Sequence, residues 1–172
     1  MDIGNKMDKP ETVVAMSKGP FYHAIYILIN FSKGFFIPYL AESVLMLEAG
    51  MLSATILCAF IAHLWSPFRK FKQDTSFFWF ILGVYVFMSP QFLYIFPLFY
   101  IISALILNSF PFGYLVAISG MLFAIWLSEL PLYLLPTNVG VFLILLFALR
   151  SYLSDEIEAG KTWTIQSSFH NR

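Results

Sequence analysis

Residues 76–149 read SFFWFILGVYVFMSPQFLYIFPLFYIISALILNSFPFGYLVAISGMLFAIWLSELPLYLLPTNVGVFLILLFAL. This run contains no Lys, Arg, Asp or His, and Glu129 is its only charged residue. A helix of a water-soluble fold keeps a polar face toward solvent, so a run this long without charges indicates helices that lie in lipid. The run therefore predicts a polytopic membrane protein.

The composition of the whole chain points the same way. Its 172 residues are 59% hydrophobic and 12% charged, and the mean hydropathy is +0.77. Soluble domains carry about 25% charged residues, roughly twice this share. The net charge is zero, so no basic balance suggests contact with nucleic acid. The single cysteine, Cys58, excludes an intrachain disulfide and a metal site built from cysteines.

We expect an all-α fold, a transmembrane helical bundle of four to six short spans with both termini in the cytoplasm. Polar cytoplasmic tails are expected over 1–20 and 151–172, on either side of a membrane domain over 21–150. The first tail lacks the early apolar core of a cleaved signal peptide, so the first hydrophobic segment is expected to be retained. The expected spans are 21–41, 44–65, 76–88, 92–108, 112–128 and 132–150.

Two of these segments leave alternatives open. The segment 21–41 contains Lys33, and a lysine in mid-span costs roughly 2.5–3.5 kcal/mol. It is either a span whose lysine reaches the interface, or an interfacial helix at 21–31 that breaks at Ser32–Gly34. The segment 76–108 would be about 50 Å long as one helix, against a hydrocarbon core of about 30 Å. A hairpin broken at Ser89–Gln91 is favoured over a kinked or re-entrant element.

The basic residues fix the expected orientation. Lys and Arg occur only within 1–33, 66–75 and 150–172. The loop 66–75 carries Arg69, Lys70 and Lys72, and short basic loops stay in the cytoplasm under the positive-inside rule.

Two stripes of small residues recur at helical spacing. The first contains Gly50, Ala54, Cys58 and Ala62, and the second contains Gly113, Ala117, Gly120, Ala124 and Ser128. Small residues on one face allow two helix backbones to approach closely in lipid. We expect both stripes to pack against other helices, and Gly50 and Gly120 are candidate interaction residues.

Two carboxylates are the other candidate functional residues. Glu129 is an ionisable group within the apolar run, which by default suggests a function, although its position beside Pro131 also suits a membrane surface. Glu48 lies near the start of the span 44–65, either as an interfacial carboxylate or as a partner of Lys33 across a helical hairpin. No spacing of His, Cys or carboxylates suits a metal, and no cofactor motif is present.

These features favour a non-enzymatic protein that binds another integral membrane protein, or a second copy of itself, in addition to membrane lipids. The apolar run offers no Asp or His for catalysis. In size, hydropathy and sparse charge, the chain resembles the inner-membrane entry-exclusion proteins of conjugative plasmids. The resemblance implies a bacterial inner membrane and the blocking of redundant conjugation, or a related immunity to phage.

Two alternative functions stay open. One is a small transporter or channel subunit that uses Glu129 or Glu48, since buried carboxylates and broken helices mark ion routes. The other is a subunit of a lipid-modifying enzyme. That alternative predicts that single changes at Arg69, Lys70, His63 or Glu48 abolish activity.

Overall fold

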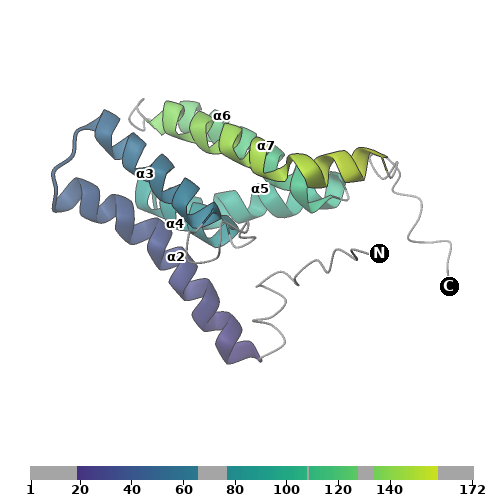
Figure 1. The fold of residues 1–172 in the computed structure, drawn as a ribbon, viewed down its shortest axis with the longest axis horizontal. Helices are drawn as coiled ribbons and strands as arrows, with labels where there is room; N and C mark the ends of the chain where they lie inside the picture. Colours follow the sequence, from purple (N-terminus) through teal and green to yellow (C-terminus); the bar gives the residue numbers. More distant parts are fainter. Residues whose placement is uncertain (1–18, 66–76, 108, 128–133, 159–172) are drawn as a thin grey trace, which may run out of the picture.

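Figure 1 shows the computed structural model of the protein, which describes residues 19–65, 77–107, 109–127 and 134–158. These residues form six helices and contain no strand: α2 (Pro20–Ser43), α3 (Ala49–Leu64), α4 (Phe77–Met88), α5 (Phe92–Leu107), α6 (Phe110–Leu127) and α7 (Leu134–Glu158). The prediction of an all-helical fold is confirmed. The division into two polar tails and a membrane domain stays a prediction.

Helix α2 is continuous through the segment that the sequence left ambiguous. It begins with Pro20, whose fixed φ suits the first helical turn, directly after Gly19 with φ +105°. The helix passes through Ser32–Gly34 without a break, so the alternative of a short interfacial helix ending there is wrong. It also contains Pro38, which lipid-embedded helices tolerate when neighbouring groups satisfy the freed carbonyl.

Helices α4 and α5 form the arms of the hairpin that the sequence favoured. The turn follows the end of α4, and the backbone N–H of Phe92 donates to the carbonyl of Ser89 over 3.0 Å. Pro90 lies in this turn and Pro97 lies inside α5.

The core is built around α4. Seven of its twelve residues are buried: Phe77, Phe80, Ile81, Leu82, Gly83, Val84 and Tyr85. Helix α2 crosses one side of α4, and α3 and α5 contact it elsewhere. The core continues into α6 and α7 through fully buried Ile118, Met121 and Leu145. In Figure 1, the N-terminal half of α2 extends away from the other helices.

Two glycines bring α2 and α4 into backbone contact. A Cβ atom added to Gly34 would overlap the carbonyl oxygen of Phe80, and one added to Gly83 would overlap the carbonyl oxygen of Phe31. Only hydrogen atoms fit between the two backbones at this crossing. The sequence pattern marks Gly34 only as part of a possible helix break, and nothing in it marks Gly83.

The two predicted stripes of small residues behave differently. On α6, a Cβ added to Gly113 would lie 2.9 Å from Ala104 Cα, and one added to Gly120 would lie 3.2 Å from the ring of Phe99. This stripe packs against α5, as predicted.

The stripe on α3 does not pack against the other described helices of this chain, and its packing against a helix of another protein stays a prediction. Gly50, Ala54, Cys58 and Ala62 are exposed, and no atom lies within 4 Å of a Cβ added to Gly50. Helix α3 buries Leu52, Ile56, Phe60 and Leu64 instead. Each of these follows a stripe residue by two positions, which places it about 200° around the helix. Because the larger side chains bury more apolar area, they take the inward face.

The helices differ in length. Among the described helices, α2 has the length and hydropathy usual for a membrane crossing, and the others include apolar stretches of 10–17 residues. Large apolar side chains are exposed on several helices, among them Leu105 at 74% and Trp126 at 66%. Such a surface suits contact with lipid rather than water.

Candidate active site at one end of the bundle

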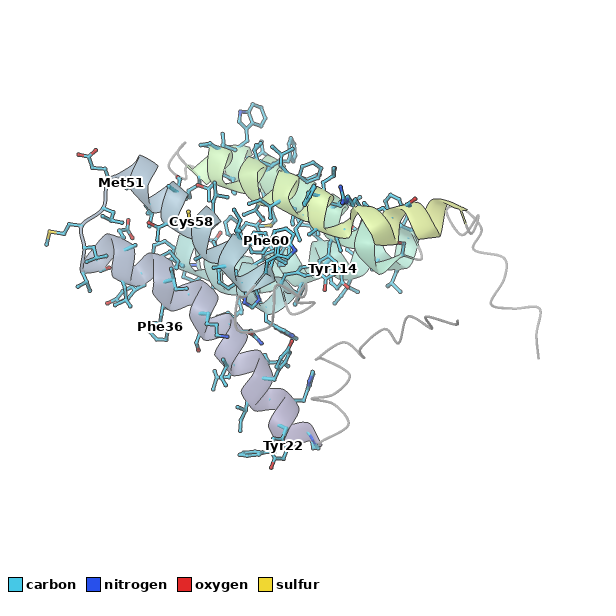
Figure 2. All side chains as sticks on the ribbon, in the orientation of Figure 1. Tyr22, Phe36, Met51, Cys58, Phe60 and Tyr114 are labelled. Atoms are coloured by element: carbon cyan, nitrogen blue, oxygen red, sulfur yellow. The ribbon has the colours of Figure 1, made fainter. Side chains whose placement is uncertain are left out.

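Helix directions bring the end of α3, the start of α4 and the C-terminal half of α7 to one end of the bundle. The middle of α2 crosses α4 there, whereas the start of α2, marked by Tyr22 in Figure 2, extends away from the other helices. Helices α2 and α4 run parallel, because Phe31 contacts Gly83 and Phe35 contacts Phe87. Helices α3 and α7 also run parallel. Their contacts pair Ser53 with Thr137, Leu57 with Gly140, and Trp65 with Phe147.

We call this end the basic end, defined by His63, Trp65, Phe77 and Arg150. The segment 66–76 connects Trp65 to Phe77 here and contains Arg69, Lys70 and Lys72. These three residues lie outside the described residues, but the two ends of their segment are fixed. Arg150 is exposed on α7. Among the described cationic residues, Arg150 therefore lies at the same end of the bundle as His63.

His63 lies in the last turn of α3 and is half-buried. Its imidazole stacks on the ring of Phe80, with centroids 4.7 Å apart and planes 17° apart. The other neighbour of Phe80 is Phe60, whose ring centroid lies 5.7 Å away. Since Phe60 and Phe80 are both almost fully buried, they form a rigid base beneath the imidazole. A histidine held in this way at the edge of an apolar core can accept or donate a proton.

Helix α2 adds polar groups beside this stack. Gly34 packs against the backbone of Phe80, and the residue before it, Lys33, is exposed. Asn30 is 4% exposed, and its amide Nδ2 donates to the Tyr26 carbonyl over 2.9 Å.

The predicted partnership between Lys33 and Glu48 is wrong. Glu48 is the N-cap residue of α3 and lies at the opposite end of that helix from His63. Lys33 lies ten residues before the end of α2 at Ser43, which is about 15 Å along the helix. The carboxylate of Glu48 is therefore far from the basic end.

The other predicted site residues have mixed outcomes. Glu129 lies outside the described residues. Gly120 contributes to the contact between α5 and α6, and Gly50 faces outward. The roles of Glu129, Glu48, Gly50 and Gly120 in function or binding stay predictions.

A buried polar network was missed by the sequence analysis. The hydroxyl of Tyr85 on α4 donates to Asn138 Oδ1, and Asn138 Nδ2 donates to the Ile118 carbonyl over 3.5 Å. Thr137 Oγ1 donates to Ser53 Oγ over 2.7 Å. The network connects α7 to α3, α4 and α6.

Thr137 and Asn138 lie in the first turns of α7, which begins at Leu134. Both side chains are 1% exposed and bond across to other helices. Polar residues that face other helices in lipid commonly form such hydrogen bonds between helices. The polar side chain of Tyr85 within the apolar run was a further sequence feature that pointed to the network.

Comparison with known proteins decides the family. The model of one family, described as glycerol-3-phosphate acyltransferase, matches residues 11–157, which is most of the chain. This chain belongs to the glycerol-3-phosphate acyltransferase family. No curated protein matches it by sequence.

Two solved structures have the same fold. One is the crystal structure of PlsY (YgiH), an integral membrane glycerol 3-phosphate acyltransferase, in its lysophosphatidic acid form, with a TM-score of 0.73 and 19% identity. That match covers 90% of this chain and 78% of PlsY. The other is the glycerol 3-phosphate form of PlsY, with a TM-score of 0.72, 19% identity, and coverage of 91% and 77%. The acyltransferase-family chain is therefore an integral membrane protein with the PlsY helical fold.

The family membership corrects the predicted function. The resemblance to entry-exclusion proteins is wrong, and so are the associated roles in plasmids and conjugation. The prediction of a non-enzymatic protein is also wrong, because the family and the structural neighbours are enzymes.

The physical reason for this error lies in where polar groups occur. The apolar run lacks Asp and His, whereas His63 and the basic residues Arg69, Lys70 and Lys72 precede that run. Contact with membrane lipids suits an acyltransferase of this family, and binding to another protein or a second copy stays a prediction.

Proposed function

We propose that this protein transfers an acyl group from an activated donor to a hydroxyl of glycerol 3-phosphate at the membrane surface. The observation that carries the proposal is the family match over residues 11–157. The site described above supports it, because the basic end combines a proton-transfer group, cationic residues and access to lipid. The alternative of a lipid-modifying enzyme named His63, Arg69, Lys70 and Glu48, of which Glu48 lies at the opposite end of α3 from His63.

The reaction needs one base and an activated acyl carbonyl. The hydroxyl oxygen of glycerol 3-phosphate attacks the carbonyl carbon and forms the new ester bond. The bond between that carbon and the leaving group of the donor, an acyl phosphate or thioester, then breaks. The leaving group carries away the electron pair, and the hydroxyl proton passes to a base. His63 is the described side chain at the basic end best suited to accept this proton, with its ring orientation fixed by Phe80.

The phosphate of the substrate needs cationic partners. Arg69, Lys70 and Lys72 follow His63 closely in sequence, and guanidinium and ammonium groups bind phosphate oxygens through charge-assisted hydrogen bonds. The acyl chain needs an apolar environment, which the surrounding lipid and the exposed apolar helices provide. This division places the ester-forming step at the boundary between headgroups and hydrocarbon.

The same arrangement supports a location. The positive-inside rule places the basic end in the cytoplasm, where soluble glycerol 3-phosphate reaches it directly. We propose that the protein belongs to a bacterial inner membrane with its basic end facing the cytoplasm.

Variants of the purified full-length protein in proteoliposomes test the residue roles. Labelled glycerol 3-phosphate is supplied with a long-chain acyl phosphate or an acyl thioester, and label in the organic phase is measured. The change His63→Ala should reduce kcat by about 10²–10⁴-fold, the usual contribution of a general base. Changing Arg69, Lys70 or Lys72 to Gln should mainly raise the KM for glycerol 3-phosphate.

The matched control is Cys58→Ser, which alters an exposed residue on the outer face of the same helix and should leave the rate unchanged. Equal activity of His63→Ala and wild type would refute the role of His63. Normal KM values in all three basic-segment variants would refute the phosphate site.

A further inference from the structure

A groove runs between α3 and α7 on the outer surface of the bundle. It is lined by Ile61, Trp65, Leu143, Ile144 and Phe147. These side chains are all apolar or aromatic, and Leu143 and Phe147 are 58% and 56% exposed. The groove lies outside the proposed reaction, which uses His63 and the segment that follows Trp65.

One end of the groove is cationic. The guanidinium carbon of Arg150 lies 4.6 Å from the centroid of the Phe147 ring. The ring of Phe147 meets Trp65 edge-on, with centroids 6.2 Å apart and an interplanar angle of 61°. Since Arg150 is exposed, stacking on Phe147 orients its charge without consuming its hydrogen-bond donors.

The residues at the cationic end of the groove are of the types found at a membrane–water interface. Tryptophan is enriched at the headgroup level of membranes, and Trp65 directly precedes the basic segment. Arg150 is one helical turn beyond Phe147, about 4.5 Å further along α7. From Leu143 to Arg150 the surface therefore changes from apolar to aromatic to cationic over about 10 Å.

We propose that this groove binds an anionic phospholipid. One acyl chain lies along Ile61, Leu143 and Phe147, and the headgroup phosphate pairs with Arg150. Basic sites between transmembrane helices on the cytoplasmic side bind anionic headgroups in this way. A second copy of this chain is a poorer occupant, because the carboxylates whose exposure is described, Glu42 and Glu48, lie at the opposite end of the bundle from Arg150. The proposal does not depend on acyl transfer, because binding is measured directly.

The test is native mass spectrometry of the purified full-length protein after exchange into mixed phosphatidylglycerol and phosphatidylcholine. The expected result is preferential retention of phosphatidylglycerol by the wild type. Arg150→Gln should reduce that retention about fivefold, which corresponds to the roughly 1 kcal/mol that one basic residue contributes near anionic headgroups. Arg150→Lys, which preserves the charge, should retain most of the preference.

Two further variants separate the groove from a general surface effect. Leu143→Trp fills the groove and should reduce retention of lipid, whereas Leu146→Trp changes an exposed α7 residue outside the lining and should have no effect. Free glycerol 3-phosphate, added in excess, should not displace the lipid, which distinguishes a lipid site from a phosphate site.

Three results would overturn the proposal. These are equal retention of the two lipids by the wild type, an unchanged preference in Arg150→Gln, and displacement of the lipid by glycerol 3-phosphate. An intermolecular disulfide formed by Leu143→Cys in a Cys58→Ser background would also overturn it, by showing that a second copy covers the groove.

Discussion

Substitution of Gly34 by alanine tests the crossing of α2 and α4, on which the position of α2 depends. The new Cβ would overlap the Phe80 carbonyl oxygen and lie close to its carbon and Cα atoms. All three atoms belong to a helix backbone, so no rotamer change relieves the contact and the two helices must separate. Overpacking of this kind costs about 3 kcal/mol at the upper end of its usual range. The higher helix propensity of alanine returns about 1 kcal/mol, so the expected net loss is about 2 kcal/mol.

Gly50→Ala is the matched control for this substitution. It has the same chemistry and the same propensity gain, but no atom lies within 4 Å of the new Cβ. It should leave stability unchanged or raise it by up to about 1 kcal/mol. The double variant Gly34→Ala/Gly83→Ala should lose less than the sum of its two single changes, because one substitution already separates the helices.

Equilibrium unfolding in mixed micelles measures the wild type and the four variants, with acyl transfer as a second readout. The free energies of unfolding of Gly34→Ala and Gly50→Ala should differ by about 3 kcal/mol. Equal stabilities would show that α2 and α4 do not cross in backbone contact. In that case the placement of Lys33 and Asn30 beside the stacked rings of Phe80 and His63 would also be wrong.

Three further predictions address other contacts. Tyr85→Phe removes the hydroxyl bonded to Asn138 and should cost about 0.6–1.7 kcal/mol, the range measured for hydrogen bonds between membrane helices; an unchanged unfolding midpoint would contradict the buried network. Gly120→Leu should lower thermal stability in detergent, because its side chain must displace the ring of Phe99, while unchanged stability would count against packing of this stripe on α5. Reporter fusions after residues 75 and 172 should report the cytoplasm, whereas a fusion after residue 42 should report the opposite side; a periplasmic signal at residue 75 or 172 would reverse the proposed orientation.

The helices were predictable because their signals are local. A long run without charges identifies lipid-embedded helices, and Ser89–Gln91 marks the turn between α4 and α5. A proline in the first turn of a helix and basic residues near helix ends are also features that can be recognised from a short stretch of sequence. These features need no knowledge of which helices are neighbours, so composition and spacing were sufficient for an all-helical membrane fold.

The contacts between helices were less predictable. Gly34 and Gly83 each stand alone among large residues, and their importance comes from the crossing of α2 and α4. The small residues of α3 had the expected spacing, but Leu52, Ile56, Phe60 and Leu64 have the same spacing on the opposite face. Spacing alone cannot decide which stripe faces the bundle.

The enzymatic function was missed because the search concentrated on the uncharged run. The sequence places His63 near the end of the expected span 44–65. The structure places it in the last turn of α3 and stacks its imidazole on Phe80, next to the crossing of α2 and α4. A membrane enzyme that acts on a charged substrate needs its polar groups at the membrane surface, so sparse charge within the spans does not argue against catalysis.

The most direct test of the central claim is acyl transfer by the purified wild-type protein in proteoliposomes. We predict that label from glycerol 3-phosphate enters the organic phase as a lipid with one acyl chain, and that this depends on an activated acyl donor. Unphosphorylated glycerol should be a poor acceptor, because it lacks the phosphate that we propose Arg69, Lys70 and Lys72 to bind. The account would be contradicted if a correctly folded protein formed no ester from either an acyl phosphate or an acyl thioester, or acylated glycerol as readily as glycerol 3-phosphate.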